Sequence, residues 1–203
     1  VKKYESAGIA GISIEDKIFP KQNSLLENGT HALLSEKDFV GKIIAANDAK
    51  QNKEFMIIAR VEALIAGLGM DKAIKRARAY EKAGADAILI HSKKHTPEEI
   101  FEFVDSWNGN LPIVVVPTNY GTVKIDELIQ HKIKMTIYAN QTLRAAHAAI
   151  TRTLNEMIKV ESMNEIKEKI SSMEDIFQLQ EMYDLKTNEA ALEEKYKKLG
   201  YDS

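Results

Sequence analysis

Five short apolar runs, separated by segments with helical periodicity, constrain the fold of this chain more than any other feature. Each run is almost continuously apolar, which is typical of a strand buried on both faces of a parallel sheet. The segments between the runs repeat apolar residues every three or four positions, as amphipathic helices do. The pattern therefore predicts a series of β/α units, with strands at 8–14, 55–61, 85–91, 111–117 and 134–139.

Three of the intervening segments predict helices with recognisable ends. They are expected over 37–51, 69–84 and 95–107. In the second, Asp71 is a suitable N-cap or first-turn acid and Gly84 a suitable residue just past the last turn. In the third, Thr96 is expected to cap the helix and Pro97 to occupy its first position.

Alternating β/α units form either an open doubly wound sheet or a closed barrel. No G-x-G-x-x-G motif follows a strand, which weakens the dinucleotide-binding form of the open sheet. A whole (β/α)₈ barrel needs about 250 residues. This chain has 203 residues, and only helical patterns follow the fifth run. We therefore predict an α/β fold, a (β/α)₈ barrel that is incomplete here with about five units, and expect about three further units upstream.

The composition excludes several classes of protein. The formal net charge is −2, without the basic excess of a nucleic-acid-binding protein. The absence of cysteine excludes disulfides, thiolate metal sites and a cysteine nucleophile. The sequence has no run of about 18 apolar residues, so we predict no membrane span. The N-terminal sequence has no signal-peptide pattern. We expect a cytoplasmic protein with no nucleic-acid or membrane partner.

In a barrel, the chemistry is expected where the strands end, because catalytic groups come from their carboxyl ends. Glu15 ends the first run and could serve a hard cation, directly or through water. Asp16 is the weaker candidate because the next residue of a strand points to the other face. Arg60 lies inside an apolar run and needs an anion, either a bound phosphate or carboxylate or a structural ion pair with Glu62 or Glu15. His91 faces the same way as Arg60 and is either a phosphoryl contact or a satisfied core residue.

A long connection of about residues 16–37 follows the first strand. Connections of this length inside compact domains are usually functional lids or disordered segments. Lys21, Asn23 and Ser24 are placed to reach a bound anion if the segment closes, and Asn28 with Gly29 predicts a turn. We predict a gating loop that excludes water from the mouth of the barrel.

The C-terminal part of the chain is highly charged and helical in pattern. We place the domain boundary after residue 158, with a partial barrel over 1–158 and a helical extension over 159–203. The extension carries an apolar face, including Ile176, Phe177 and Leu179, that is too large to leave in water. We expect this face to pack on the barrel or on a neighbouring subunit.

Several motifs together resemble one enzyme family across nearly the whole chain. The similar segments are EDKIFPKQNSL (15–25), IARVEALIAG (58–67), GADAILIHSKK (84–94), VVVPT (114–118) and YANQTLRAA (138–146). They look like the gating loop and strand ends of the phosphoenolpyruvate mutase family, within the isocitrate lyase and phosphoenolpyruvate mutase superfamily. The loop and the ARVEA motif are the most specific of these.

This resemblance implies a magnesium-dependent interconversion of phosphoenolpyruvate and phosphonopyruvate, the entry to phosphonate biosynthesis. By resemblance, Glu15 supports Mg²⁺ through water. Catalytic roles fall to Lys21, Asn23, Arg60 and His91, and substrate contacts to Asn23, Ser24, Leu25, Arg60 and His91. Family members exchange a C-terminal helix between subunits, so a homodimer or homotetramer is implied.

Three alternatives remain open at this point. Phosphonopyruvate hydrolase is similar but typically has Thr at the position of Asn23. The lyase branch uses a Lys-Cys-Gly-His loop, and this chain has no cysteine. The strands that carry the family's nucleophilic and magnesium-binding aspartates are not matched, so the chain alone is expected to be inactive. A non-catalytic truncated remnant acting as an interaction module is therefore the third alternative.

Overall fold

The computed structural model describes residues 1–26 and 29–201, in two compact units, Val1–Ala139 and Asn140–Ser203. The predicted domain boundary after residue 158 stays a prediction. Among the residues described, no helix has the length and apolar character needed to cross a membrane.

The first unit is built on a parallel sheet of five strands that lie side by side in chain order. The strands are β1 (Gly11–Glu15), β2 (Met56–Val61), β3 (Ala87–Ile90), β4 (Ile113–Val115) and β5 (Met135–Thr136). This confirms the predicted α/β class and all five strand positions. The strands are shorter than the apolar runs because burial continues past the paired segments, as at Val116, which is 8% exposed just after β4.

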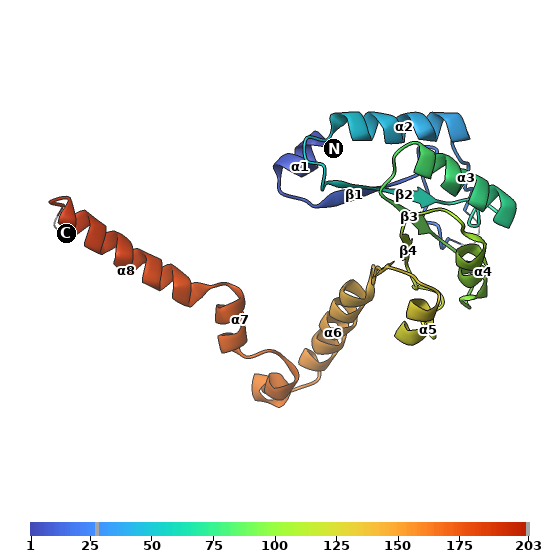
Figure 1. Cartoon of the computed structure of the whole chain (residues 1–203). Coiled ribbons are helices and arrows are strands. Elements are labelled where there is room, and N and C mark those ends of the chain that lie inside the picture. The colour runs from blue at the N-terminus through green and yellow to red at the C-terminus, as the bar shows by residue number, and fades with distance from the viewer. Residues whose placement is uncertain (27–28, 202–203) are drawn as a thin grey trace. The chain divides into compact units, whose positions relative to one another are not determined.

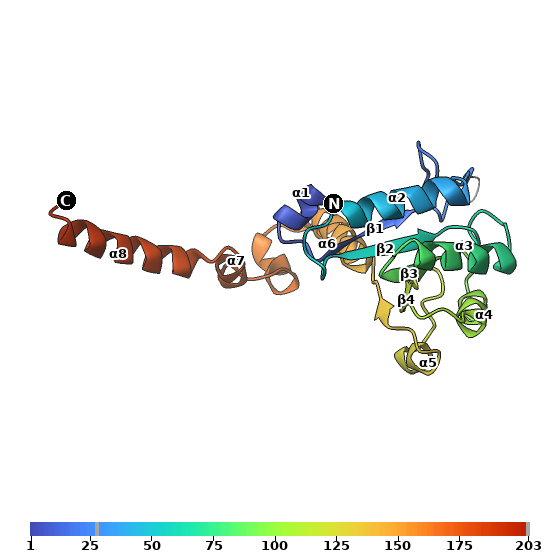
Figure 2. The ribbon, with the colours of Figure 1, turned by 45° about the horizontal axis from the view of Figure 1, so that its top comes forward.

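Helices follow the first four strands, in the order expected of β/α units. They are α2 (Glu36–Ala49), α3 (Met70–Lys82), α4 (Glu98–Ser106) and α5 (Ile125–Gln130), and a short α1 (Lys2–Ser6) precedes the sheet. Figures 1 and 2 show α2, α3 and α4 along the same side of the sheet. Helix α5, only six residues long, was not predicted.

The predicted helix ends are mostly confirmed. Asp71 lies in the first turn of α3, and Gly84 follows its last turn with a φ of 93° that suits glycine. One prediction was wrong, because Pro97 rather than Thr96 occupies the N-cap position of α4. The proline has helical dihedral angles there, and the helix begins at Glu98, one residue later than expected.

The sheet has two apolar faces, and they separate the core from the site. Ala59 and Val61 of β2 join the large core formed with the helices, whereas Ile58 packs on a smaller cluster that includes Leu89 of β3. We call the face with Ile58 and Leu89 the inner face. Strand residues alternate between faces, so Arg60 lies on the inner face together with Ile58.

The connection between β1 and α2 is closed at its base. Lys17 and Leu33 form an antiparallel bridge, and the Leu34 amide donates to the carbonyl of Asp16 over 2.8 Å. The predicted long connection is therefore present, with its two ends held together. Asn28 of the predicted turn lies outside the described residues.

The second unit is helical, as predicted for the tail. It comprises α6 (Gln141–Met157), a 3₁₀ segment η1 (Met163–Lys169), α7 (Met173–Leu179) and α8 (Met182–Lys198). Ser162 and Ser172 cap η1 and α7 through their side chains. Ile166 is buried, but Leu143 and Leu179 are 72% and 79% exposed within the chain. The packing of this apolar face on the barrel or on a neighbouring subunit stays a prediction.

Candidate active site

Three predicted site residues meet at the carboxyl ends of neighbouring strands. Glu15 ends β1 and is paired in register with Arg60 of β2, while His91 directly follows β3. Arg60 Nη2 lies 2.8 Å from His91 Nδ1, and Arg60 Nε lies 3.3 Å from Glu15 Oε2. The expectation that His91 faces the same way as Arg60 is thereby met in the geometry.

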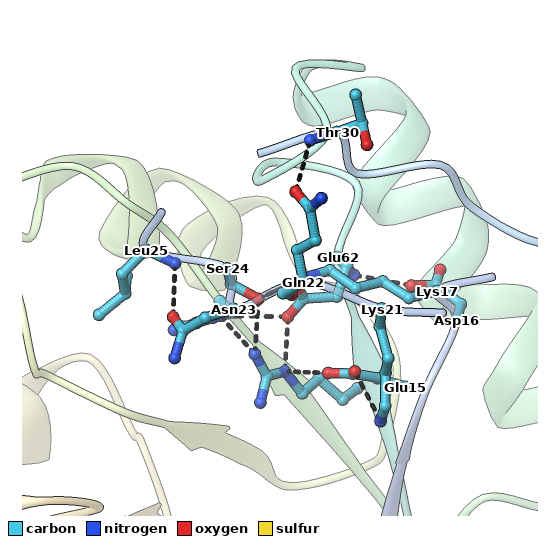
Figure 3. Close-up of polar contacts among 12 residues, drawn as sticks. Glu15, Asp16, Lys17, Lys21, Gln22, Asn23, Ser24, Leu25, Thr30 and Glu62 are labelled. Atoms are coloured by element: carbon cyan, nitrogen blue, oxygen red, sulfur yellow. Dashed lines mark hydrogen bonds and ion pairs between the residues drawn. The ribbon is translucent and has the colours of Figure 1, made fainter. Parts of the chain in front are cut away.

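The connection after β1 brings two further predicted residues to this group (Figure 3). Ser24 is buried, and its Oγ accepts a hydrogen bond of 3.0 Å from Arg60 Nη2. Lys21 Nζ lies 2.8 Å from Glu15 Oε1, in an ion pair that is partly open to solvent. Both residues contact the strand ends. This segment therefore covers part of the inner face at the carboxyl ends of the strands, which we call the inner-face rim.

Asn23 and Leu25 are paired with each other instead. The Leu25 amide donates to Asn23 Oδ1 over 2.9 Å, which makes a local turn beside Ser24. Figure 3 shows this hydrogen bond next to the strand-end group. Asn23 is exposed and Leu25 half-buried. Their predicted substrate contacts stay predictions.

Two residues that the sequence reasoning did not select belong to the same group. Glu62, which follows β2, is fully buried, and Lys17 is 4% exposed. Lys17 Nζ donates to Ser24 Oγ over 2.7 Å and lies 3.3 Å from Glu62 Oε2. The alternation of strand residues could have identified both, since Lys17 lies two residues after Glu15 and Glu62 two after Arg60.

Glu62 is the anion that Arg60 was predicted to need. Its Oε1 accepts from Arg60 Nε and lies 3.1 Å from His91 Nδ1, and its Oε2 accepts from Ser24 Oγ over 2.6 Å. Burial alone raises the pKa of Glu62, but hydrogen bonding and charge from His91 and Arg60, with the Ser24 hydroxyl, outweigh it and lower the pKa to about 2. These contacts therefore favour the ionised form of Glu62 at neutral pH.

Arg60 thus makes the structural ion pairs considered as one alternative, with both Glu62 and Glu15. Its side chain nevertheless stays 25% exposed, so a ligand can reach the guanidinium. Nε and Nη2 have partners within the part of the chain that the structure describes. Among the contacts of residues 1–26 and 29–201, Nη1 is the nitrogen left to bind an added anion, so the two alternatives for Arg60 are compatible.

The tautomer of the neutral His91 ring depends on which of its two neighbours hydrogen-bonds Nδ1. When Arg60 Nη2 donates to Nδ1, the neutral ring carries its proton on Nε2. That N–H is then a donor for a ligand oxygen. When Nδ1 instead donates to Glu62, the neutral ring leaves Nε2 as an acceptor. The arrangement in which Arg60 donates to Nδ1 is therefore the one that suits an anionic ligand.

Asp16 does not belong to this group. It is fully buried on the opposite face, where its Oδ2 accepts from Tyr80 OH over 2.6 Å and from Arg76 Nη1 over 2.9 Å, and its Oδ1 from the Glu62 amide over 2.9 Å. Burial raises the pKa of Asp16, and the hydrogen bonds from Tyr80 and the Glu62 amide oppose the rise. These partners use its oxygens, and its place on the opposite face confirms the reason for ranking Asp16 below Glu15 as a cation ligand.

The described residues supply only part of a metal site. No three acidic or histidine side chains in the described ranges 1–26 and 29–201 are grouped as metal ligands. Glu15 is the carboxylate of the inner-face rim that solvent reaches, with a side chain 13% exposed. Carboxylate oxygens suit Mg²⁺, which usually keeps several waters. Glu15 therefore fits a role in which a water molecule intervenes.

The parallel β/α fold, with cationic groups gathered at the carboxyl ends of its strands, defines a barrel-type protein. The family model described as phosphoenolpyruvate phosphomutase matches residues 1–158. This chain therefore belongs to the phosphoenolpyruvate phosphomutase family.

Similar proteins support this membership. Phosphoenolpyruvate phosphomutase of Tetrahymena pyriformis is 45% identical over 186 residues, which cover 92% of this chain and 62% of that protein. A crystal structure of phosphoenolpyruvate phosphomutase from Streptomyces platensis subsp. rosaceus matches with a TM-score of 0.91 and 43% identity, over 94% of this chain and 66% of that one. A phosphonopyruvate hydrolase solved with oxalate and Mg²⁺ matches with a TM-score of 0.85 and 42% identity, over 93% and 64%. The chain thus spans slightly less than two thirds of these relatives.

Proposed function

We propose that this chain forms part of an enzyme that interconverts phosphoenolpyruvate and phosphonopyruvate. The observation that carries the proposal is the meeting of Arg60, His91 and Ser24 at the inner-face rim, where cationic and hydroxyl groups converge on one place. Family membership supports the same reaction. The roles of these residues toward substrate are part of the proposal.

The reaction moves a phosphorus group within one molecule. The bond from phosphorus to the enol oxygen breaks and a bond from phosphorus to carbon forms, with no other reactant consumed. Transfer of a phosphoryl group depends mainly on positioning and on stabilising the charge of its oxygens. Arg60 supplies a guanidinium whose planar donors match such oxygens, and His91 supplies an N–H donor beside it.

Mg²⁺ is proposed as the cofactor. The hydrolase relative was solved with oxalate and Mg²⁺, and Glu15 is placed to support such an ion through water. When bound, the ion would stabilise the negative oxygens of the pyruvyl part of the substrate. Glu15 then has to share its charge with Lys21 and Arg60, which it contacts in this structure.

The segment of about residues 16–37 is proposed as a gating loop. Lys21, Asn23, Ser24 and Leu25 are the residues proposed to close over the substrate. Exclusion of water matters for this chemistry, because water that attacks the phosphorus converts phosphonopyruvate to pyruvate and phosphate. The buried position of Ser24 and its bond to Arg60 support the closed arrangement.

Phosphonopyruvate hydrolysis is the second candidate function. The hydrolase relative is 42% identical, nearly as similar as the phosphomutase of known structure. Asn23, where the hydrolase typically has Thr, favours the mutase. Both functions break the bond from phosphorus to carbon of phosphonopyruvate, but the mutase gives phosphoenolpyruvate and the hydrolase gives pyruvate and phosphate. A single assay of the products therefore separates them.

The assay is ³¹P NMR with phosphonopyruvate and Mg²⁺, made on the 203-residue chain and on any longer protein that contains it. The mutase reaction gives a phosphoenolpyruvate signal. Phosphate without phosphoenolpyruvate would support the hydrolase instead, and no turnover in the longer protein would favour a non-catalytic interaction module. Cleavage of a methylisocitrate-type substrate would revive the lyase alternative.

We also propose a cytoplasmic homodimer or homotetramer that associates through the C-terminal helices. The exposed apolar residues of this unit, such as Leu143 and Leu179, support association because such surface is unfavourable in water. Light scattering of the purified chain tests this, and a monodisperse monomer would contradict it.

A further inference from the structure

Glu62 has an unusual set of neighbours for a single buried carboxylate. Oε1 contacts two groups of the strand ends, Arg60 Nε and His91 Nδ1. Oε2 contacts two groups of the segment after β1, Ser24 Oγ at 2.6 Å and Lys17 Nζ at 3.3 Å. The two oxygens thus divide their contacts between the barrel and the loop.

The charge of Glu62 makes these contacts strong. A buried carboxylate is stable only when it is paired and hydrogen-bonded, and this one is fully buried between two cations and two further polar groups. Loss of the charge would leave Lys17, also buried, without its anion. Each neighbour therefore has a strong preference for its present position.

Glu62 itself is unsuited to bind the proposed substrate. Its charge has the same sign as a phosphonate or carboxylate ligand, and its side chain is inaccessible to solvent. Its influence on a ligand has to pass through Arg60, whose remaining nitrogen Nη1 is oriented once Nε is bonded to Glu62. The same holds for His91, because fixing Nδ1 directs Nε2 away from the carboxylate.

We propose that Glu62 is a positioning residue that couples closure of the loop to the geometry of the anion site. It holds Arg60 and His91 for the ligand, and the same carboxylate holds Lys17 and Ser24 of the loop. Opening of the loop removes Ser24 from Oε2, while Lys17 stays in the closed base of the connection, and it loosens the strand-end pair. The role toward a phosphorus anion rests on the proposed function, whereas the coupling between loop and strand ends is independent of it.

The test is the substitution Glu62→Gln, which keeps the shape and removes the charge. Hydrogen exchange of the amides of residues 17–25 is expected to become at least about tenfold faster, while the amides of β3 stay protected. The matched control is Glu102→Gln, on the exposed face of α4, which is expected to leave exchange in the loop unchanged. Unchanged loop exchange in folded Glu62→Gln would overturn the coupling.

Kinetics provide the second readout in an active protein. Glu62→Gln is expected to lower kcat at least tenfold with a KM changed less than threefold, because the ligand still meets Arg60 but in a less favourable geometry. A normal kcat would overturn the positioning role. If the protein proves inactive on phosphonopyruvate, the exchange experiment still decides the coupling.

A milder variant keeps the proposal falsifiable if Glu62→Gln does not fold. Lys17→Met removes one loop partner of Oε2 and keeps the apolar stem buried. It is expected to accelerate exchange of residues 17–25 and to leave the amides of Arg60 and His91 protected. Loop exchange equal to that of the unsubstituted chain in this folded variant would contradict the coupling.

Discussion

Two buried carboxylates lie on opposite faces of the same sheet edge and differ in what surrounds them. Asp16 is held by Arg76, Tyr80 and a backbone amide, in a set we call the Asp16 cluster. Glu62 is held in the Glu62 cluster, which comprises Glu62, Lys17, Ser24, Arg60 and His91.

The difference lies in accessibility and in the balance of charge. In the Asp16 cluster, the Arg76 side chain is 13% exposed and also donates to the carbonyl of Leu34. The partners of Arg76 named here are therefore groups of the protein itself. In the Glu62 cluster, Arg60 is 25% exposed and also pairs with Glu15. With Glu15 and its partner Lys21 included, three cations (Lys17, Lys21 and Arg60) face two carboxylates. The first cluster holds secondary structure together, and the second retains positive charge for a ligand.

The largest expected effect is on stability, from removing Asp16. Asp16→Ala leaves Arg76 buried without its anion, which costs about 3–5 kcal/mol of unfolding free energy. Urea denaturation measures it, with Asp48→Ala at an exposed position near the end of α2 as control. A loss of unfolding free energy below about 1 kcal/mol would contradict the structural role of Asp16.

The next effect is on activity, from removing Arg60. Arg60→Met is expected to lower kcat/KM of the active protein by about 10²–10³-fold, the range for loss of a group that stabilises developing charge. Arg60→Lys is expected to recover only part of this, because an ammonium cannot reproduce the planar donors. Equal activities of the Met variant and the unsubstituted protein would show that Arg60 has no role in the proposed active site.

Acid sensitivity sharpens the comparison. The pKa of Glu62 falls from 4.5 to about 2 on folding, so its contribution, on the order of 3 kcal/mol, is complete above pH 4.5. It is lost as the pH falls from 4.5 toward 2. Asp16, whose pKa is raised, acts in the opposite sense.

Urea titrations of Glu62→Gln and the unsubstituted chain at pH 7 and pH 3 measure this contribution. The stability difference between the two proteins is expected to shrink at the lower pH. A difference that stays constant would show that the charge of Glu62 does not stabilise the fold.

The smallest effect is expected at an exposed ion pair. Lys169 Nζ and Glu156 Oε2 of the second unit lie 2.9 Å apart, with the lysine side chain 56% exposed. Lys169→Met should change the unfolding free energy by less than about 1 kcal/mol. Thermal denaturation checks this. A larger loss of unfolding free energy would mean that burial does not predict how much an ion pair stabilises this protein, in the two clusters as well.

Much of the first unit follows from sequence alone. The five apolar runs locate the strands, because short and nearly continuous apolar runs suit strands of a sheet covered on both faces. Strand alternation places Arg60 and His91 on one face and Asp16 on the other. Helix α5 was missed because six residues carry too little periodicity to be distinguished from a loop.

The partners within the site could not be read from the sequence. Lys17, Lys21 and Arg60 can each reach a carboxylate, and only the path of the loop decides that Lys21 meets Glu15 while Lys17 meets Glu62. Arg76 reaches Asp16 from a helix 60 residues away. Such choices depend on tertiary packing and not on local pattern.

Arg60 and His91 are proposed to bind one anion together. The most direct measurement is ¹⁵N NMR of the Arg60 guanidinium and the His91 ring during titration with methylphosphonate. Both signals are expected to shift with the same dissociation constant. Signals that do not move, or that follow two different dissociation constants, would contradict a shared anion site.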